Sequence, residues 1–177
     1  TNKMAAGACN DEEISKIQML FNQAKITTDY RKVTVAAKNH KQETGHTSAA
    51  IELEDGTIIC GHSSELLGCS AALLLNVTKH LGDIDHNLKL IPQSMIEPIQ
   101  YTKVNYLGGH NPRLHTDEVL VALSVLSEND ENCRVALQQL PKLRGCQAHC
   151  TVMLSDVDQR IFKKLGVNIT CEPVLKK

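Results

Sequence analysis

The chain has 177 residues, enough for one domain with a full hydrophobic core. It is 42% hydrophobic and 22% charged with a net charge of −1, which argues against disorder and against a basic surface for nucleic acid. No apolar run approaches the roughly 20 residues that a membrane-spanning helix needs.

Helical spacing of apolar residues dominates the first part of the chain. Asn10, followed by acidic residues, is typical of a helix N-cap and predicts an amphipathic helix over 11–24. A second helix is expected from residue 27 or 28 to residue 43, with Gly45 as its C-cap. We expect residues 1–45 to form a helical lead-in, with 1–9 loosely held.

Two β-prone runs, 48–53 and 57–60, flank the dipeptide Asp55-Gly56. Asp-Gly between such runs predicts a β-hairpin, because both central turn residues adopt positive φ. The Ala- and Leu-rich run 69–81 is apolar on most faces, which predicts a buried helix directly after the hairpin.

The rest of the chain alternates between strand and helix patterns. Further strands are expected at 88–91, 149–154 and 167–171. Further helices are expected from Ser94 with Pro98 in the first turn, from Thr116, over 131–140 and over 156–165. This alternation predicts an α/β fold, a three-layer α-β-α sandwich with a mixed sheet over residues 46–177.

The most polar turn of the sequence covers 108–118 and leads into a helix. A helix start favours anions, and an arginine can bind phosphate or carboxylate with two hydrogen bonds. Histidine exchanges protons near neutral pH. The alternative is a capped loop whose polar groups satisfy backbone carbonyls. The candidate ligand-binding residues here are Asn111 and Arg113, and the candidate catalytic residues are His115, Asp117 and Glu118.

A second candidate loop, 61–70, joins the hairpin to the buried helix. Its glycines and serines before a helix are typical of phosphate contacts, so Ser63, Ser64 and Ser70 are candidate ligand-binding residues. His62 beside Ser63 resembles a base with its nucleophile, but neighbouring residues in a loop rarely reach that geometry. The alternative is an ordinary connecting loop.

The seven cysteines are odd in number and no secretory signal is present, which favours reduced thiols and a cytoplasmic location. Cys69, Cys146, His149 and Cys150 include zinc-ligand types. The familiar two-residue spacing between cysteines is missing, however, and the alternative is a set of scattered buried thiols. We therefore expect no metal ion and no cofactor. The start at Thr1 leads us to expect a fragment or a processed chain.

Several runs carry a family resemblance: 49–53 with Asp55-Gly56, 66–76, 96–100, 111–120, 140–146 and 165–173. Together they resemble the C-terminal part of a bacterial family known as "domain of unknown function eighteen-forty-six". The run Asn-Pro-Arg-Leu-His-Thr-Asp-Glu at 111–118 makes the resemblance specific. Members of the family are longer and carry an N-terminal α/β domain.

The resemblance implies a fold similar in topology to cytidine deaminases. Zinc deaminases place a His or Cys, and then Ala-Glu, at the start of the helix that follows the hairpin. This sequence reads Cys69-Ser70-Ala71 there and lacks the glutamate, and its second half lacks the Pro-Cys-x-x-Cys partner. Zinc deamination is therefore disfavoured, and the family supplies no established activity.

Two functions stay open, and so does the question of whether the chain is an enzyme. The first is a ligand-binding or assembly domain of a larger bacterial protein, which holds an anionic, phosphate-bearing small molecule. The second is a catalytic domain that uses acid–base chemistry at His115 and Arg113, with Asp117 or Glu118 as the orienting carboxylate. A purely structural role is a third reading. The expected partners are the small molecule, the N-terminal domain and a second copy of the chain, but neither nucleic acid nor membrane.

Overall fold

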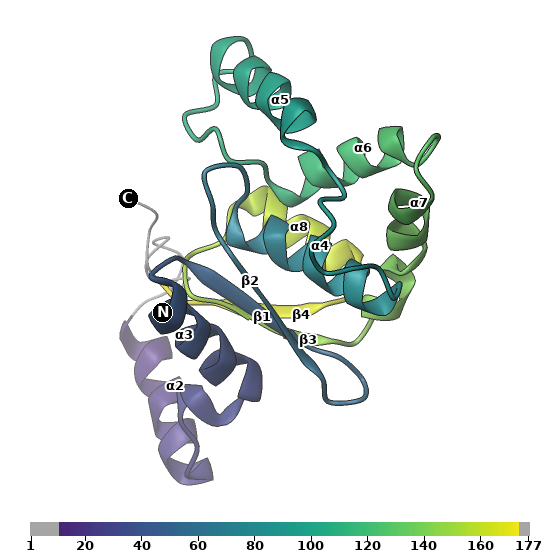
Figure 1. Cartoon of the computed structure of the whole chain (residues 1–177). Coiled ribbons are helices and arrows are strands. Elements are labelled where there is room, and N and C mark those ends of the chain that lie inside the picture. Colours follow the sequence, from purple (N-terminus) through teal and green to yellow (C-terminus); the bar gives the residue numbers. More distant parts are fainter. Residues whose placement is uncertain (1–10, 174–177) are drawn as a thin grey trace.

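The computed structural model describes residues 11–173, which form a four-stranded mixed sheet between two groups of helices (Figure 1). The sheet order is β2-β1-β3-β4. β1 pairs antiparallel with both β2 and β3, and β3 pairs parallel with β4. The α/β class and the mixed sheet are as predicted. The strands are β1 (Ser48–Glu52), β2 (Ile58–His62), β3 (Gln147–Cys150) and β4 (Asn168–Cys171).

The Asp55-Gly56 turn closes the hairpin of β1 and β2, as the sequence predicts. The expectation of positive φ at both turn residues was wrong for Asp55, because only Gly56 of the two has a positive φ. Gly56 has a φ of +84°, which glycine adopts without a steric cost. The backbone N–H of Leu53 donates to the carbonyl of Thr57 at 2.9 Å, and the side chain of Asp55 accepts from the N–H of Thr57 at 2.9 Å. This turn therefore fixes the register of the hairpin.

One face of the sheet is covered by α3 (Lys32–Thr44), which packs Val33 and Ala37 against Ala50 of β1. The prediction of one continuous helix from residue 27 or 28 was wrong. A short 3-10 helix, Thr28–Tyr30, comes first, and Arg31 separates it from α3 with an extended backbone. The guanidinium of Arg31 donates to side-chain and backbone oxygens on β3 and β4, which explains the break. α2 (Asp11–Ala24) lies beside α3 (Figure 1).

The other face carries the remaining helices: α4 (Cys69–Leu81), α5 (Gln93–Asn105), α6 (Thr116–Leu126), α7 (Glu131–Gln138) and α8 (Asp156–Lys164), with a 3-10 helix at Leu140–Leu143. α4 is buried on most sides, as predicted, and packs on both strands of the hairpin. The largest hydrophobic cluster joins α4, α8 and the sheet, and includes Ile51, Leu73 and Phe162. A second cluster joins α4 to α5, α6 and α7.

Two predicted elements differ from the structure in this half. Residues 88–91 form no strand, because Leu90 and Ile91 are buried among helices in the second cluster and do not reach the sheet. The strand expected at 149–154 is β3, which ends at Cys150. α5 begins at Gln93, so Pro98 lies in its second turn rather than its first, on the exposed side of the helix.

The N-terminal predictions are tested only in part. α2 has its predicted bounds, whereas residues 1–9 and the expected cap Asn10 lie outside the described residues. The domain division at residue 45 stays a prediction. In the part of the chain that the structure describes, no helix has both the length and the apolar character to cross a bilayer.

Candidate functional site

The two loops singled out in the sequence lie side by side. Leu67 and Leu114 form an isolated parallel bridge. The N–H of Leu114 donates to the carbonyl of Leu66 at 2.9 Å, and the N–H of Gly68 donates to the carbonyl of Leu114 at 3.1 Å. Leu114 is fully buried, so it anchors the loop 108–118 against the segment that leads into α4.

Arg113 connects the same two loops through its side chain. Its Nε donates to the carbonyl oxygen of Ser64 at 2.6 Å, and its own carbonyl accepts from Nζ of Lys103 at 2.7 Å. Asn111 accepts from the N–H of Arg113 through Oδ1 at 3.2 Å. Among residues 11–173, neither terminal nitrogen of this guanidinium has a hydrogen-bond partner. Arg113 therefore presents up to four N–H donors beside Ser64.

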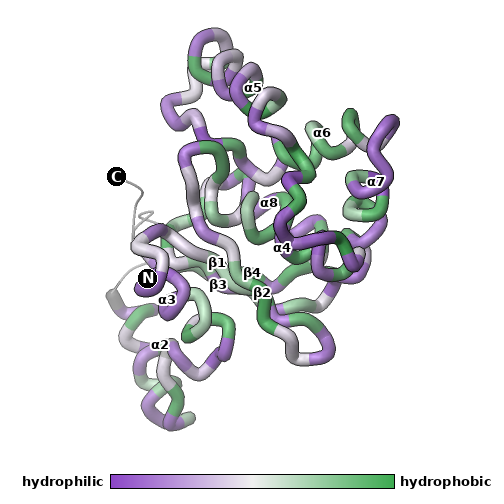
Figure 2. The backbone as a smooth tube through the Cα atoms, in the orientation of Figure 1, coloured by the Kyte–Doolittle hydropathy of each residue, from purple (hydrophilic) through white to green (hydrophobic). Residues whose placement is uncertain are grey.

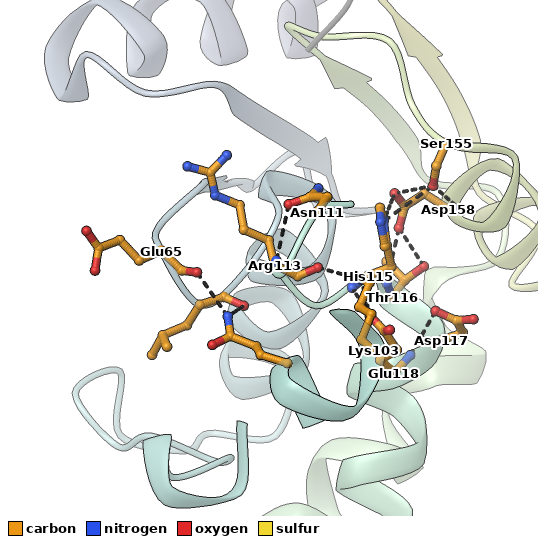
Figure 3. Close-up of polar contacts among 12 residues, drawn as sticks. Glu65, Lys103, Asn111, Arg113, His115, Thr116, Asp117, Glu118, Ser155 and Asp158 are labelled. Atoms are coloured by element: carbon orange, nitrogen blue, oxygen red, sulfur yellow. Dashed lines mark hydrogen bonds and ion pairs between the residues drawn. The ribbon is translucent and has the colours of Figure 1, made fainter. Parts of the chain in front are cut away.

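His115 lies between Arg113 and a buried carboxylate (Figure 3). Its Nδ1 is 3.0 Å from Oδ2 of Asp158, on the first turn of α8. Ser155, the N-cap of α8, donates its hydroxyl to the same carboxylate oxygen at 2.7 Å. Thr116 donates its N–H and its hydroxyl to Oδ1 of Asp158 at 3.1 and 2.9 Å. Asp158 thus ties the start of α8 to the start of α6.

The charge on Asp158 is fixed by these contacts. Burial by itself raises the pKa of a carboxyl group, and the side chain of Asp158 is fully buried. Hydrogen bonds from His115, Ser155 and Thr116 outweigh burial and hold the pKa of Asp158 well below its usual range. Asp158 is therefore an ionised carboxylate that sets the orientation of the His115 ring. Nε2 of that ring has no hydrogen-bond partner among the described residues, and the side chain is 18% exposed.

The two acidic residues that follow shortly after His115, Asp117 and Glu118, do not contact its imidazole ring. Glu118 accepts from the backbone N–H of His115 at 2.7 Å and from Nζ of Lys103 at 2.8 Å. Asp117 accepts from the N–H of Glu118 at 2.9 Å. These contacts stabilise the first turn of α6. The carboxylate that contacts the imidazole ring is that of Asp158.

The three candidate serines occupy different environments. Ser64 is exposed, and its Oγ accepts from the N–H groups of Leu66 and Leu67. Ser63 is buried, and its Oγ accepts from the hydroxyl of Thr47 at 2.8 Å. Ser70 is also buried, and its Oγ has no hydrogen-bond partner among the described residues. Ser64 is thus the candidate serine that a ligand can reach.

Ser64 also lines a cavity of about 430 Å³. Its apolar wall comes from the loop, from α4 and from the second hydrophobic cluster. Lys79 of α4 is buried in its polar part, where Nζ donates to the carbonyls of His86 and Leu88 at 2.7 and 3.4 Å. Burial lowers the pKa of Lys79. The lining residues are Ser64, Leu66, Leu67, Ala72, Leu75, Asn76, Lys79, His86, Asn87, Leu88, Lys89, Leu90, Ile91 and Ile96.

The four residues considered for zinc do not converge. The Sγ atoms of Cys69 and Cys150 are 3.2 Å apart at the start of α4. His149 instead points its Nδ1 at the hydroxyl of Thr170, and the Sγ of Cys146 lies 3.8 Å from the carbonyl of Lys142. Within residues 11–173, no group of three or more His, Cys, Asp or Glu side chains is arranged to hold a metal ion.

The sequence predicted no role in the site for three of its residues: Asp158, Lys79 and Lys103. Asp158 had a local signal, because Ser155-x-x-Asp158 is typical of a helix N-terminus. That signal predicts a cap, but not a contact with a histidine 43 positions away. The two lysines lie inside helices and carry no local pattern that predicts their burial.

Comparison with known proteins places the chain in a family. A family model described as "Domain of unknown function DUF1846, C-terminal" matches residues 29–177. Similar relatives are UPF0371 proteins of Corynebacterium urealyticum, 49% identical over 93% of this chain, and of Corynebacterium glutamicum, 48% identical over 92%. A UPF0371 protein of Streptococcus pyogenes is 43% identical over 93% of the chain. The chain covers 33% of the length of each of these relatives, and it belongs to the DUF1846 family.

Proposed function

We propose that this chain is a ligand-binding domain of a larger bacterial protein and that it holds an anionic small molecule with an apolar portion. The observation that carries the proposal is the junction at Ser64. There the carbonyl of Ser64 accepts a hydrogen bond from Nε of Arg113, and Ser64 also lines the 430 Å³ cavity. The cavity volume lies within the range of small-molecule sites.

The lining of the cavity favours a ligand with two chemical parts. Five leucine side chains, with Ile91 and Ile96, provide apolar surface for a hydrocarbon group. Lys79 and Lys89 provide positive charge, and no Asp or Glu is among the lining residues. A buried lysine that contacts only carbonyl oxygens gains from an added anion, because the anion offsets its cost of burial. A carboxylate or a phosphate monoester fits this requirement.

A direct test uses three small probes: inorganic phosphate, hexanol and hexyl phosphate. The amide signals of Ser64, Leu67 and Asn76 are followed by NMR as each probe is added. We expect hexyl phosphate to shift these signals at a lower concentration than either of the other two probes. Equal binding of hexanol and hexyl phosphate would remove the anionic part of the proposal, and no shift with any probe would remove the site.

Acid–base catalysis at His115 is the second candidate function, and the ionised, buried Asp158 is the observation that favours it. A carboxylate on Nδ1 fixes the tautomer that leaves Nε2 as the proton acceptor. The free donors of Arg113 then lie on the same loop and suit a developing negative charge. A screen of phosphate and carboxylate esters for turnover tests this candidate. If the unchanged protein hydrolyses an ester and His115→Gln hydrolyses it equally fast, His115 is not the catalytic base.

A fold similar in topology to cytidine deaminases is also part of the proposal. A hairpin followed at once by a buried helix, and the meeting of Cys69 with Cys150 at the start of that helix, support it. Zinc deamination stays disfavoured, because Ala71 stands where a deaminase carries its glutamate. A cytoplasmic location also remains part of the proposal.

A further inference from the structure

The helix α2 carries an apolar face that the rest of the described chain covers only in part. Ile14, Ile17, Leu20 and Phe21 follow helical spacing, which places them along one side of the helix. Ile17 is 50% exposed and Leu20 is 58% exposed. None of the three hydrophobic clusters includes a residue of α2. Figure 2 shows hydrophobic residues between hydrophilic ones along α2, as in an amphipathic helix.

A groove continues this face toward the sheet. It has a volume of about 430 Å³ and runs from Phe21 and Ile26 past Tyr30 to the end of β4. Tyr30 is 74% exposed at its edge. An exposed apolar helix face that continues into a groove is typical of a surface that is covered in the complete molecule.

The comparisons indicate what covers it. The matching family model is the C-terminal one and begins at residue 29, after α2. A UPF0371 protein of Corynebacterium aurimucosum aligns with 173 residues, 98% of this chain, so the aligned stretch includes α2 even though the C-terminal family model does not. This stretch is 35% of that relative's length. Because the matched domain is named as C-terminal, most of the remaining length precedes it in the relative.

We propose that the apolar face of α2 and the adjoining groove are the docking surface for the part of the polypeptide that precedes this domain. α2 then acts as the contact between the two parts of the longer protein. Contacts between domains of one chain are built from such faces, with apolar residues at the centre and polar residues around them. The surface is separate from the ligand site, which lies on the opposite face of the sheet with α4 and α6 (Figure 1).

The test compares hydrogen exchange of α2 in two proteins: the longer protein that contains this chain, and the 177-residue chain alone. We expect the amides of α2 to exchange about tenfold more slowly in the longer protein, because docking opposes local unfolding. The variants Ile17→Glu and Leu20→Glu, made together in the longer protein, should restore the fast exchange. Both residues are exposed in the chain alone, so its thermal midpoint should stay unchanged.

A matched control is Val125→Glu, which changes an equally exposed residue on α6 (59% exposed). This variant should leave the exchange of α2 in the longer protein unaltered. Equal exchange of α2 in the two proteins would overturn the proposal. So would protection in the chain alone that rises with protein concentration and accompanies a dimer in light scattering, because the occupant would then be a second copy.

Discussion

Asp158 and His115 are 43 positions apart in the chain, yet a carboxylate oxygen of Asp158 lies 3.0 Å from Nδ1 of the imidazole. The side chain of Asp158 is fully buried, whereas that of His115 reaches the surface. The pair therefore joins the interior of the second helical layer to the loop that carries Arg113. Any ligand that contacts Nε2 of His115 therefore meets an imidazole ring whose orientation is fixed by a buried negative charge.

Replacement of Asp158 tests how much this contact stabilises the fold. In Asp158→Asn, the carboxylate becomes an amide with a single oxygen. If that oxygen still accepts from Thr116, the amide nitrogen replaces the oxygen that contacts His115 and Ser155 and cannot accept a hydrogen bond. Because several hydrogen bonds to a charged group are weakened, we expect a loss of about 3 kcal/mol in the free energy of unfolding. Urea denaturation followed by circular dichroism measures it.

A control for that substitution lies on the same helix turn. Asp156 is exposed and also belongs to the first turn of α8, so Asp156→Asn removes a charge there without a buried contact. We expect this control to cost less than about 1 kcal/mol. Equal losses in the two variants would show that the position near the helix N-terminus matters and that the contact with His115 does not.

The charge of Arg113 is expected to contribute directly to binding of an anion. Arg113→Gln removes the guanidinium that Ser64 holds through its carbonyl. Hydrogen bonds to charged groups are worth about 1.5 to 3 kcal/mol, so affinity for hexyl phosphate should fall by roughly tenfold or more. Calorimetric titration measures the change. Lys142→Gln, an exposed cation far along the chain, is the control and should bind as the unchanged protein does.

The apolar part of the site makes a separate prediction about chain length. Each methylene group that enters an apolar cavity contributes about 0.8 kcal/mol. Hexyl phosphate should therefore bind roughly tenfold more tightly than butyl phosphate in the cavity lined by Leu66, Leu67 and Leu75. Equal affinities for the two alkyl phosphates would place the anion on the surface near Arg113 and leave the cavity unused.

Local sequence patterns predicted the parts of this molecule that local physics determines. Gly56 supplies the positive φ of the hairpin turn, and the run 69–81 is apolar on most faces, so the hairpin and the buried helix follow from neighbouring residues alone. The polar groups and turn residues gathered at 108–118 predict a candidate site in that loop. Local patterns thus predicted one part of the site, the loop that carries Arg113 and His115.

Long-range contacts account for the rest. Arg31 breaks the expected helix because its guanidinium binds oxygens on strands more than 100 residues away. Residues 88–91 look like a strand because Leu90 and Ile91 are apolar, and burial among helices satisfies them equally well. Asp158 has the local pattern of a cap, and only the packing of α8 against α6 turns it into the partner of His115.

Acidification should reduce stability in two separate ranges of pH. Burial lowers the pKa of His149, and this outweighs the opposing effect of Glu172. The folded state thus favours neutral His149, so its contribution is present above the unfolded pKa of about 6.5 and is lost as the pH falls below it. The lowered pKa of Asp158 acts later, because the stability it contributes is lost only as the pH falls below about 4.

Urea denaturation at pH 7.5 and at pH 5.5 checks the first range. The unchanged protein should be less stable at pH 5.5, and His149→Gln should show a smaller difference between the two values. Burial and neighbouring histidines also lower the pKa of His62, so part of the difference should remain in this variant. An undiminished difference in His149→Gln would assign the effect to His62 or to another group.

Gly61 of β2 packs closely against the backbone of α4. A Cβ atom at this position would lie 2.4 Å from the backbone nitrogen of Leu73 and 2.6 Å from its Cα. Because those atoms are helix backbone, Gly61→Ala can be accommodated only if α4 moves away from β2. We expect a loss of about 3 kcal/mol in the free energy of unfolding, at the upper end of the cost of overpacking.

Gly45→Ala is the matched control, since it adds the same methyl group where no atom lies within 4 Å. Its φ of +72° makes alanine cost about 1 kcal/mol through backbone strain alone. α4 also carries Lys79 and Asn76, so the shift that Gly61→Ala imposes should weaken hexyl phosphate binding, whereas Gly45→Ala should leave binding unchanged. If Gly61→Ala neither unfolds more easily nor binds hexyl phosphate more weakly than Gly45→Ala, the close packing of β2 on α4 does not determine where the cavity lies.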